Sequence, residues 1–389
     1  MSRSALDNTA SVILRVLENR PITGIRQYRK RSAFVMKSPN ASSLQTETQR
    51  TRTTSKTVLA ADIGGTNARF MAWRYDFDGC VQSTFSWCCR TADYTTFDRC
   101  FERMMLELQL QHFDSACFAV AGVVENNRCT LTNLNWTIDG ESIKARYDVL
   151  SIQVINDFEA VGYGIFELKP DEILTLHSAT PISTAPIAVL GPGTGLGEAF
   201  LVWDKRLNRY VVYPTEGSHA DFAPRGQLQH ELSLWIEKEF NECEIEQVCS
   251  GPGMVRIYDF LRQRLKLDLP ERTPAEISAE AISGTCICCK QTVGIFLEIL
   301  GAEAANLGMK CLATGGVYIA GGIPLKIKPL LQQSGLVDAF LRPGAKFHGL
   351  RNSLPLYAVL NPDVGLLGSR FVATSLLISV ESVITGQQN

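Results

Sequence analysis

The chain has 389 residues, of which 45% are hydrophobic and 20% are charged, as in an ordinary soluble globular protein. At about 100–200 residues per domain, this length corresponds to two or three domains, and the composition excludes collagen-like, coiled-coil and wholly disordered proteins. The formal net charge of −2 gives the whole chain no polyanion-binding character. No apolar run reaches about 18 residues without charged or polar breaks, so neither a membrane span nor a membrane partner is expected.

The first 56 residues differ in charge from the rest of the chain. They carry 11 Lys and Arg against 3 Asp and Glu, a net of +8, whereas the rest carries a net of −10. This Arg- and Ser-rich leader resembles an organellar transit peptide in composition, with a disordered extension as the alternative. Its two aromatic residues are too few for a nucleic-acid-binding arm. We expect an intracellular, soluble protein of the cytoplasm, with the mitochondrion or plastid as the alternative.

Of the 12 cysteines, five are clustered, at Cys88-Cys89 and at Cys286, Cys288 and Cys289. Paired CxxC motifs do not recur at the spacing of a structural zinc site, and no secretory hydrophobic segment opens the chain. We therefore expect reduced cysteines that behave as small, buried hydrophobic residues.

Apolar runs that end in glycine-rich turns recur along the body of the chain. Residues 57–61 predict a strand, 62–67 a turn and 68–73 a returning strand, which together make a β-hairpin. A second strand–turn–strand unit follows at 186–203. The remaining predicted strands are 116–124, 149–155 and 316–320, and the predicted helices are 94–111, 158–166, 227–240, 279–308 and 369–383.

The two glycine-rich turns are the strongest indication of function. Backbone N–H groups that no Cβ obstructs can converge on phosphate oxygens, and Thr66 and Thr194 add hydroxyl donors. Asp62 adds a carboxylate that could hold a hydrated Mg²⁺ beside the phosphates. One such turn is usually only a tight turn, but two with flanking apolar strands favour a nucleotide site. Neither a Walker A motif nor a dinucleotide fingerprint is present.

Other polar residues suggest acid–base chemistry on a hydroxylated substrate. Asn156 and Asp157 follow a predicted strand, where α/β sheets place their ligands, so Asp157 could accept a proton during phosphoryl transfer. The alternative role of Asp157 is to cap the helix that follows. Glu216, His219 and Glu246 lie in or beside Gly-containing segments, and each carboxylate oxygen can accept a hydrogen bond from a sugar hydroxyl. Taken alone, His219 is more simply a structural residue.

Eight segments between about residues 57 and 385 resemble the bacterial-type glucokinases in order and spacing. They are LAADIGGTNARF (59–70), TNLNW (132–136), INDFEAVGYGI (155–165), GPGTGLGEAFLV (191–202), TEGSHADFAP (215–224), VCSGPGMVRIYDF (248–260), GGVYIAGGI (315–323) and NPDVGLLGS (361–369). This family belongs to the actin-like ATPase superfamily of sugar kinases. The resemblance implies a two-domain α/β fold in which mixed sheets are flanked by helices around a central cleft for ATP. The implied domains are residues 57–165 with 366–385 and residues 166–365, after a leader of residues 1–56.

The resemblance also assigns roles to residues of this chain. Asp157 would be the catalytic base on the 6-hydroxyl of glucose. The sugar-binding residues would be Asn133, Asn156, Glu216, His219 and Glu246. The ATP-binding residues would be Asp62, Gly64, Gly65, Thr66, Asn67, Gly193, Thr194, Gly195, Gly321 and Gly322, with Asp62 near Mg²⁺ through water.

The chain departs from the family at three positions beside these motifs. Thr215 and Ser218 stand where the family commonly has Gly, and Pro192 where it often has Ala. Such changes could shift the preferred hexose without removing a ligand. Residues 220–229 contain no Cys, whereas the related repressor–kinase family has a zinc motif there, so no zinc is expected.

The expected function is phosphorylation of glucose by ATP and Mg²⁺ to glucose 6-phosphate, the first step of glycolysis, without a nucleic-acid partner. One alternative is a kinase for mannose, fructose or N-acetylmannosamine, because the choice between epimers depends on hydrogen-bond geometry. The other is a non-catalytic sugar-sensing regulator. The presence of Asp157, and the lack of a helix-turn-helix pattern in residues 1–56, argue against the regulator. A homodimer is left open.

Overall fold

The computed structural model describes residues 55–76, 81–131, 134–332 and 335–385. They form two compact units, described separately below: a smaller unit of residues 55–157 and 369–385, and a larger unit of Phe158–Gly368. The chain passes from one unit to the other after Asp157 and again after Gly368, whereas the predicted boundaries lie after residues 165 and 365. The difference arises because helix α4 (Asp157–Gly164) packs from Phe158 onward in a core of the larger unit. The leader up to residue 54 and the predicted sugar ligand Asn133 lie outside the described residues.

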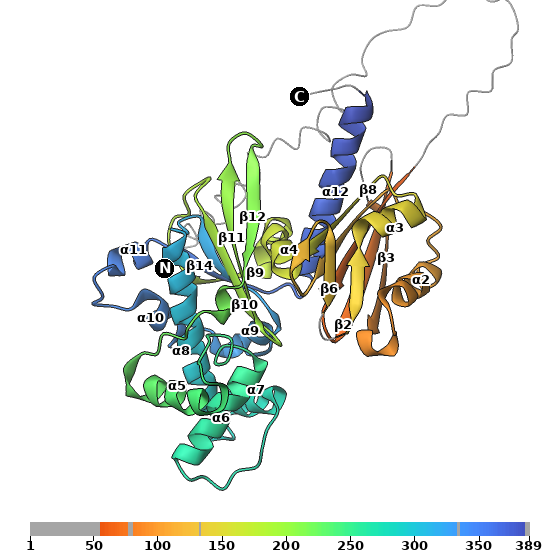
Figure 1. Ribbon diagram of the computed structural model, residues 1–389. Helices are drawn as coiled ribbons and strands as arrows, with labels where there is room; N and C mark the ends of the chain where they lie inside the picture. Colours follow the sequence, from red (N-terminus) through yellow and green to blue (C-terminus); the bar gives the residue numbers. More distant parts are fainter. Residues whose placement is uncertain (1–54, 77–80, 132–133, 333–334, 386–389) are drawn as a thin grey trace, which may run out of the picture. The chain divides into compact units, whose positions relative to one another are not determined.

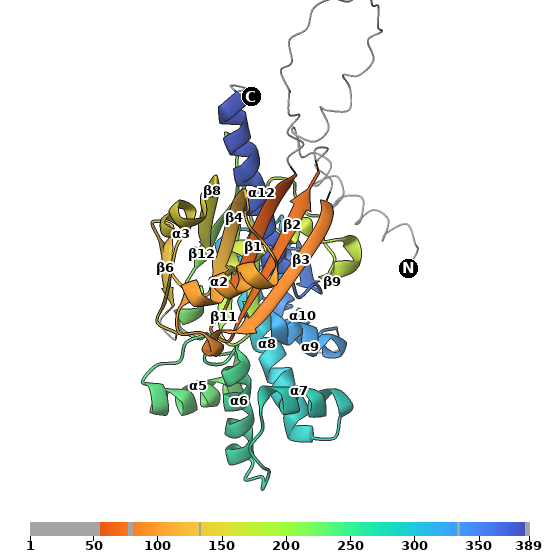
Figure 2. The same cartoon turned by 90° about the vertical axis from the view of Figure 1, so that its right-hand side faces the viewer.

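A five-stranded mixed sheet forms the centre of the smaller unit, in the order β3-β2-β1-β4-β8 (Figure 2). β1 pairs antiparallel with β2, which confirms the first predicted hairpin, and β1, β4 and β8 run parallel. These strands are β1 (Lys56–Ile63), β2 (Asn67–Tyr75), β3 (Val81–Arg90), β4 (Ser115–Val120) and β8 (Ser151–Asn156). A second, three-stranded sheet comprises β5 (Val124–Glu125), β6 (Arg128–Leu131) and β7 (Trp136–Asp139).

Helices α2 (Phe97–Glu107) and α3 (Gly140–Tyr147) belong to the same unit as these sheets. The part of helix α12 (Val364–Thr385) from Ser369 onward also belongs to it. α2 begins after the N-cap Thr96, and its buried residues Phe97 and Phe101 belong to the aromatic core of this unit. α12 is attached to the sheet where the Ser369 hydroxyl donates a hydrogen bond to the Ala61 carbonyl, 3.1 Å away. Packed helices therefore support the end of the sheet that carries the first glycine turn.

The larger unit is built around a six-stranded mixed sheet in the order β12-β11-β10-β13-β14-β9 (Figure 1). Its hairpin β10–β11 is followed by parallel pairing of β10 with β13 and of β13 with β14, so the strand arrangement of the smaller unit recurs. The strands are β9 (Ile173–His177), β10 (Ile187–Pro192), β11 (Leu196–Asp204), β12 (Arg209–Thr215), β13 (Gly316–Ile319) and β14 (Leu356–Val359). The helices are α4 (Asp157–Gly164), α5 (Gly226–Phe240), α6 (Gly251–Arg264), α7 (Pro274–Ser283), α8 (Ile287–Lys310), α9 (Gly322–Lys326), α10 (Leu336–Leu341) and α11 (His348–Asn352).

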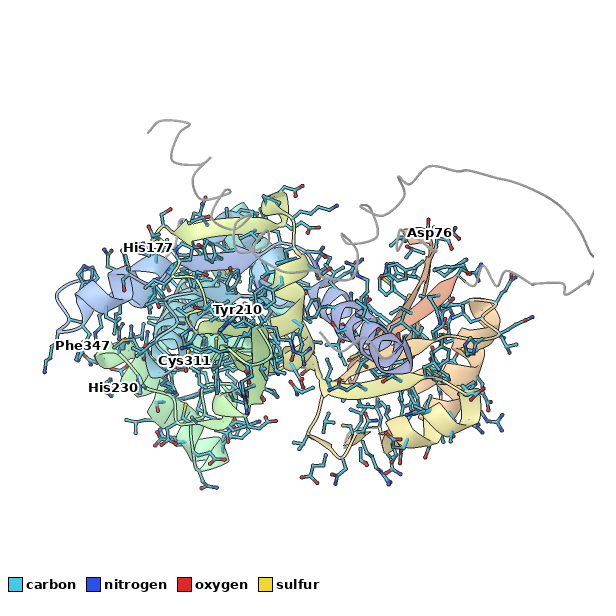
Figure 3. All side chains as sticks on the ribbon, turned by 90° about the horizontal axis from the view of Figure 1, so that it is seen from above. Asp76, His177, Tyr210, His230, Cys311 and Phe347 are labelled. Carbon is cyan, nitrogen blue, oxygen red and sulfur yellow. The ribbon has the colours of Figure 1, made fainter. Side chains whose placement is uncertain are left out.

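The strand period of two divides the residues of this sheet between two cores. Along β10, Ala188 and Leu190 belong to the core that includes α8, and the alternate residues belong to a second core with α4. In the second core Tyr210, labelled in Figure 3, stacks on Phe166 with ring centroids 5.3 Å apart. Among the described residues, only α8 is long and apolar enough to cross a membrane. Since 72% of its apolar window is buried, it is better explained as a core helix of this unit.

The single helix predicted over 279–308 is wrong, because the structure has two helices there. α7 ends at Ser283 and is followed by Gly284, whose φ of +73° is a left-handed conformation that glycine adopts without strain. α8 then begins after Cys286, whose sulfur accepts a hydrogen bond from the Cys289 N–H. Because the apolar pattern continues through this break, periodicity alone does not reveal the break.

Candidate active site

The first glycine turn connects β1 to β2 in the smaller unit. The Gly64 N–H donates to the Asn67 carbonyl at 2.9 Å, which closes the turn. Thr91 fixes its outer side, because its N–H donates to the Thr66 carbonyl and its hydroxyl donates to the Gly65 carbonyl. With these carbonyls held, Gly65 and Thr66 lie exposed at the tip, as a phosphate-binding turn requires.

Asp62, the predicted Mg²⁺ residue, lies one position before the end of β1. Its carboxylate forms an ion pair with Arg69 of β2, and its side chain is about a quarter exposed. The carboxylate therefore stays reachable from solvent beside the turn, although one of its oxygens has a cationic partner.

Asn156 and Asp157 lie at the same edge of the smaller sheet as this turn. Asn156 ends β8 and pairs in register with Val120 of β4, which in turn pairs with Ile63 of β1. The Asn156 amide donates to the Gly122 carbonyl at 3.3 Å. Asp157 is the first residue of α4. The structure thus brings the predicted base and the first glycine turn to the carboxyl ends of parallel strands, where open α/β sheets bind ligands.

The second glycine turn, between β10 and β11, lies in the larger unit. The Gly193 N–H donates to the Gly195 carbonyl at 2.7 Å, and the Gly193 carbonyl accepts from the Gly251 N–H at 2.8 Å. Gly251 is the first residue of α6, a helix that sequence reasoning missed although Ser250 is an N-cap residue. The turn is therefore braced by the start of a helix.

Gly321 and Gly322, predicted to lie beside the adenosine, are next to the second turn. Gly321 has a φ of +91°, and a Cβ there would lie 2.6 Å from the Pro192 carbonyl oxygen. Only glycine combines this backbone conformation with so close an approach. Gly322 begins α9, and a Cβ there would meet nothing within 4 Å.

The predicted sugar ligands Glu216, His219 and Glu246 come together in the larger unit. His219 Nε2 lies 3.9 Å from Glu216 Oε2, and both side chains are more than half exposed. The Glu246 N–H donates to the Ser218 carbonyl at 3.0 Å, which joins the segment of Glu246 to this loop. We call residues 215–220 the sugar loop.

The Glu246 carboxylate also contacts the second glycine turn. Its Oε2 accepts a hydrogen bond from the Leu196 N–H at 2.8 Å. A Cβ at Gly195 would lie only 2.5 Å from the same oxygen, so glycine is needed for this approach. Glu246 therefore connects the sugar loop, through its backbone, with the second turn, through its side chain.

Sequence reasoning missed Glu244, which orients His219. The Glu244 carboxylate lies 2.9 Å from His219 Nδ1, and this hydrogen bond is the main cause that raises the pKa of His219. The nearby charges of Glu246 and Glu216 act in the same direction. The alternating acids at 242, 244 and 246 are the signal in the sequence, but a contact across 25 positions needs the fold.

Glu198 is a second acid that sequence reasoning missed, and it lies beneath the sugar loop. It is 1% exposed, its Oε1 has no hydrogen-bond partner within the described part of the chain, and a Cβ at Gly217 would collide with its carboxylate. Burial, reinforced by the charge of Glu303, raises the pKa of Glu198 to about 7, with Lys310 acting in the opposite direction. The folded protein therefore holds Glu198 protonated at mildly acidic pH.

Replacement Glu198→Gln should stabilise the protein in a pH-dependent manner. The raised pKa means that wild-type stability falls as pH rises from about 4.5 to about 7, because the buried group must then ionise. The variant should therefore gain up to about 3 kcal/mol of unfolding free energy at pH 8, and less at pH 5.5. Urea unfolding at both pH values checks this, with the exposed Glu242→Gln as control. A difference that does not grow with pH would contradict the assignment.

Comparisons with known proteins agree with this architecture. The glucokinase family model matches residues 59–376. A glucokinase of Trichormus variabilis is 36% identical over 342 residues, covering 82% of this chain and 99% of the relative.

Comparison with solved structures also supports this fold. The crystal structure of a glucokinase from an Antarctic psychrotroph superimposes with a TM-score of 0.71 at 28% identity, covering 82% of this chain and 99% of the other. A glucokinase of Balamuthia mandrillaris, solved in complex with glucose, gives the same TM-score at 21% identity, covering 84% and 95%. With the family model spanning most of the body and a relative aligned over nearly its full length, this chain belongs to the glucokinase family.

Proposed function

We propose that this protein transfers the γ-phosphoryl group of ATP to the 6-hydroxyl of glucose and releases glucose 6-phosphate. The observation that carries the proposal is the position of Glu246. Its backbone is hydrogen-bonded to the sugar loop, and its carboxylate is hydrogen-bonded to a glycine turn of the kind that binds phosphate. One residue thus links a set of sugar-type ligands with a phosphate-type turn in a chain of the glucokinase family.

The sugar is held by side chains that complement its hydroxyl groups. Glu216 and Glu246 accept hydrogen bonds from hydroxyls, and such bonds to charged acceptors are stronger than neutral ones. His219 contributes Nε2, because Nδ1 is engaged by Glu244. Asn156 and Asn133 complete the proposed set.

Asp157 is the base that takes the proton of the 6-hydroxyl as the phosphoryl group is transferred. Its place at the carboxyl edge of the smaller sheet, next to Asn156 and level with the first glycine turn, supports this role. The competing role as a helix cap predicts a loss of stability rather than of turnover when Asp157 is replaced.

The ATP phosphates bind to the backbone N–H groups of the two turns, at Gly64–Asn67 and Gly193–Gly195, and Gly321–Gly322 lie beside the adenosine. Mg²⁺ bound through water at Asp62 would neutralise charge on the phosphates. Positioning and charge neutralisation account for most of the catalysis in this type of reaction.

Two of the departures from the family bear on the choice of hexose. The Thr215 hydroxyl accepts a hydrogen bond from the Gly217 N–H at 3.0 Å, and Ser218 is 3% exposed. The Thr215 hydroxyl is thus used within the sugar loop and Ser218 is buried in it, so neither change removes a proposed ligand. Membership of the glucokinase family supports glucose over mannose, fructose or N-acetylmannosamine. A regulator without catalysis would have no use for the proposed base.

Two replacements of Glu246 should separate its contacts with sugar and with the turn. The glutamine of Glu246→Gln can still accept the Leu196 N–H bond, whereas Glu246→Ala cannot. Both variants should bind glucose at least about tenfold more weakly, since a hydrogen bond to a charged group contributes about 1.5–3 kcal/mol. Only Glu246→Ala should also bind a non-hydrolysable ATP analogue more weakly without sugar.

Calorimetric titration of each ligand measures these effects, with Glu242→Gln as the matched control. Unchanged glucose affinity in both variants would place the sugar elsewhere. Equal affinity of the two variants for the nucleotide would remove Glu246 from the support of the turn.

The proposed setting is an aqueous intracellular compartment, with glucose and ATP as the ligands and no nucleic-acid partner for a body of net charge −10. The basic leader keeps its two interpretations, transit peptide or plain extension. A fluorescent fusion of residues 1–56 distinguishes them, because only a transit peptide should carry the fusion into an organelle.

A further inference from the structure

Three side chains that could ligate a metal meet at the break between α7 and α8, and none of them is a residue assigned to the kinase reaction. They are Glu280 of α7, Cys286 at the N-cap of α8 and Cys289 in its first turn. One ligand atom from each lies within 4.8 Å of the other two. The left-handed Gly284 turns the chain between the two helices and so brings the carboxylate to the thiols.

The chemistry and spacing of these groups suit a soft divalent cation. Cys286 and Cys289 form a C-x-x-C pair, the ligand spacing common in zinc sites. The Cys289 sulfur lies 3.6 Å from Glu280 Oε2. With metal bonds of about 2.3 Å to sulfur and about 2.1 Å to oxygen, the edge of a tetrahedral zinc site between these atoms is also about 3.6 Å. The pair is thus already at the separation that a shared metal ion requires.

The charges around the cluster would balance such an ion. Arg272 Nε donates to Glu280 Oε1 at 2.9 Å, which leaves Oε2 directed at the thiols. A divalent cation would be neutralised by two thiolates, while Glu280 and Arg272 neutralise each other. Arg272 also donates to the Tyr258 hydroxyl at 2.8 Å, so a second layer of hydrogen bonds fixes the carboxylate.

The burial of the three ligands fits a site that a metal ion enters from one side. Cys289 is fully buried and Cys286 is 9% exposed, whereas the Glu280 side chain is 30% exposed and forms the entrance. Without metal, burial raises the pKa of the Cys289 thiol, and the nearby Cys286 and Glu280 raise it further. The Cys289 thiol is therefore protonated in the free protein and would release its proton when it binds a metal.

The geometry points to a binding site for Zn²⁺ or a similarly soft divalent cation, formed by Glu280, Cys286 and Cys289 with the fourth position left to water. Such an ion would join α7 to α8 across their break and stabilise the helical part of the larger unit. The sequence predicted no zinc, because residues 220–229 lack Cys and because paired CxxC motifs do not recur. The proposal departs from that prediction because Glu280, from the neighbouring helix, supplies a third ligand in place of a second Cys pair.

Cadmium titration of the full-length protein, kept reduced by a non-thiol reductant, tests the site directly. A cadmium–thiolate bond gives an ultraviolet charge-transfer band, and one equivalent of Cd²⁺ should saturate it. Cys286→Ser and Cys289→Ser should each reduce the band by at least half, whereas Cys88→Ser, at an exposed thiol, should leave it unchanged. No band in the wild type, or the same band in all three variants, would overturn the proposal.

A second measurement, alkylation of the wild-type protein, needs no variant and so cannot fail through misfolding. Zn²⁺ should protect Cys286 and Cys289 of the wild type from alkylation, mapped by peptide mass spectrometry in mild denaturant, while Cys88 reacts equally with and without zinc. As a separate check, Zn²⁺ should raise the thermal midpoint of the wild type more than that of Glu280→Gln. Equal alkylation of the two thiols with and without zinc would refute the site.

Discussion

Replacement Asp157→Asn should lower kcat for glucose phosphorylation by about 10²–10⁴, the usual cost of removing a general base. Asparagine keeps the size and most hydrogen bonds of the side chain but cannot take the proton of the 6-hydroxyl. It is also as good an N-cap residue as aspartate, so the replacement spares any capping role. Glucose affinity should therefore change far less than kcat, and the thermal midpoint should hold or rise.

Steady-state kinetics, calorimetric glucose binding and thermal unfolding of the same preparation check this result. Asp171→Asn, at an exposed position in the other unit, is the control and should retain wild-type turnover. Near wild-type kcat in Asp157→Asn would assign the base to another residue. Loss of folding would show that the fold needs the charge of the Asp157 carboxylate, since asparagine retains the capping ability.

Replacement Glu216→Gln should reduce kcat/KM for glucose at least about tenfold. Glu216 lies with its carboxylate 3.9 Å from His219 Nε2 and is 63% exposed, so a bound sugar can reach it without rearrangement of the core. Glutamine keeps the shape but removes the charge that strengthens a hydrogen bond to a hydroxyl. Because the side chain is exposed, the thermal midpoint should stay the same.

The coupled kinetic assay over a glucose series measures this effect, and Glu242→Gln again serves as the exposed control. KM for ATP should change little, since among the described residues no hydrogen bond or ion pair joins the Glu216 side chain to the Gly193–Gly195 turn of the same unit. Wild-type glucose kinetics in Glu216→Gln would exclude this carboxylate from the sugar site.

Local patterns were enough to predict the strands that carry the two glycine turns and Asn156, although not the helix α6 that braces the second turn. The hairpins that carry the turns at Gly64–Asn67 and Gly193–Gly195 are adjacent in sequence, so apolar runs interrupted by glycines reveal them. The strand that ends at Asn156 was equally visible, because it is a short apolar run followed by polar residues.

Elements that depend on distant contacts were not predictable in this way. The break at Gly284 lies within a continuous apolar pattern, because α7 and α8 are both buried against the same core. Glu244 and Glu198 gain their importance from His219 and from the sugar loop, which only the folded chain brings to them. The double contact of Glu246 likewise joins residues 50 positions apart.

The central claim, glucose phosphorylation by this chain, is tested most directly by a coupled assay of the purified protein with Mg·ATP and a panel of hexoses. The account predicts the highest kcat/KM for glucose, with mannose, fructose and N-acetylmannosamine well below it. ATP consumption should be stoichiometric with glucose 6-phosphate and should be very low without sugar, because binding of the sugar completes the catalytic site. Preference for another hexose, or glucose binding without turnover, would contradict the account.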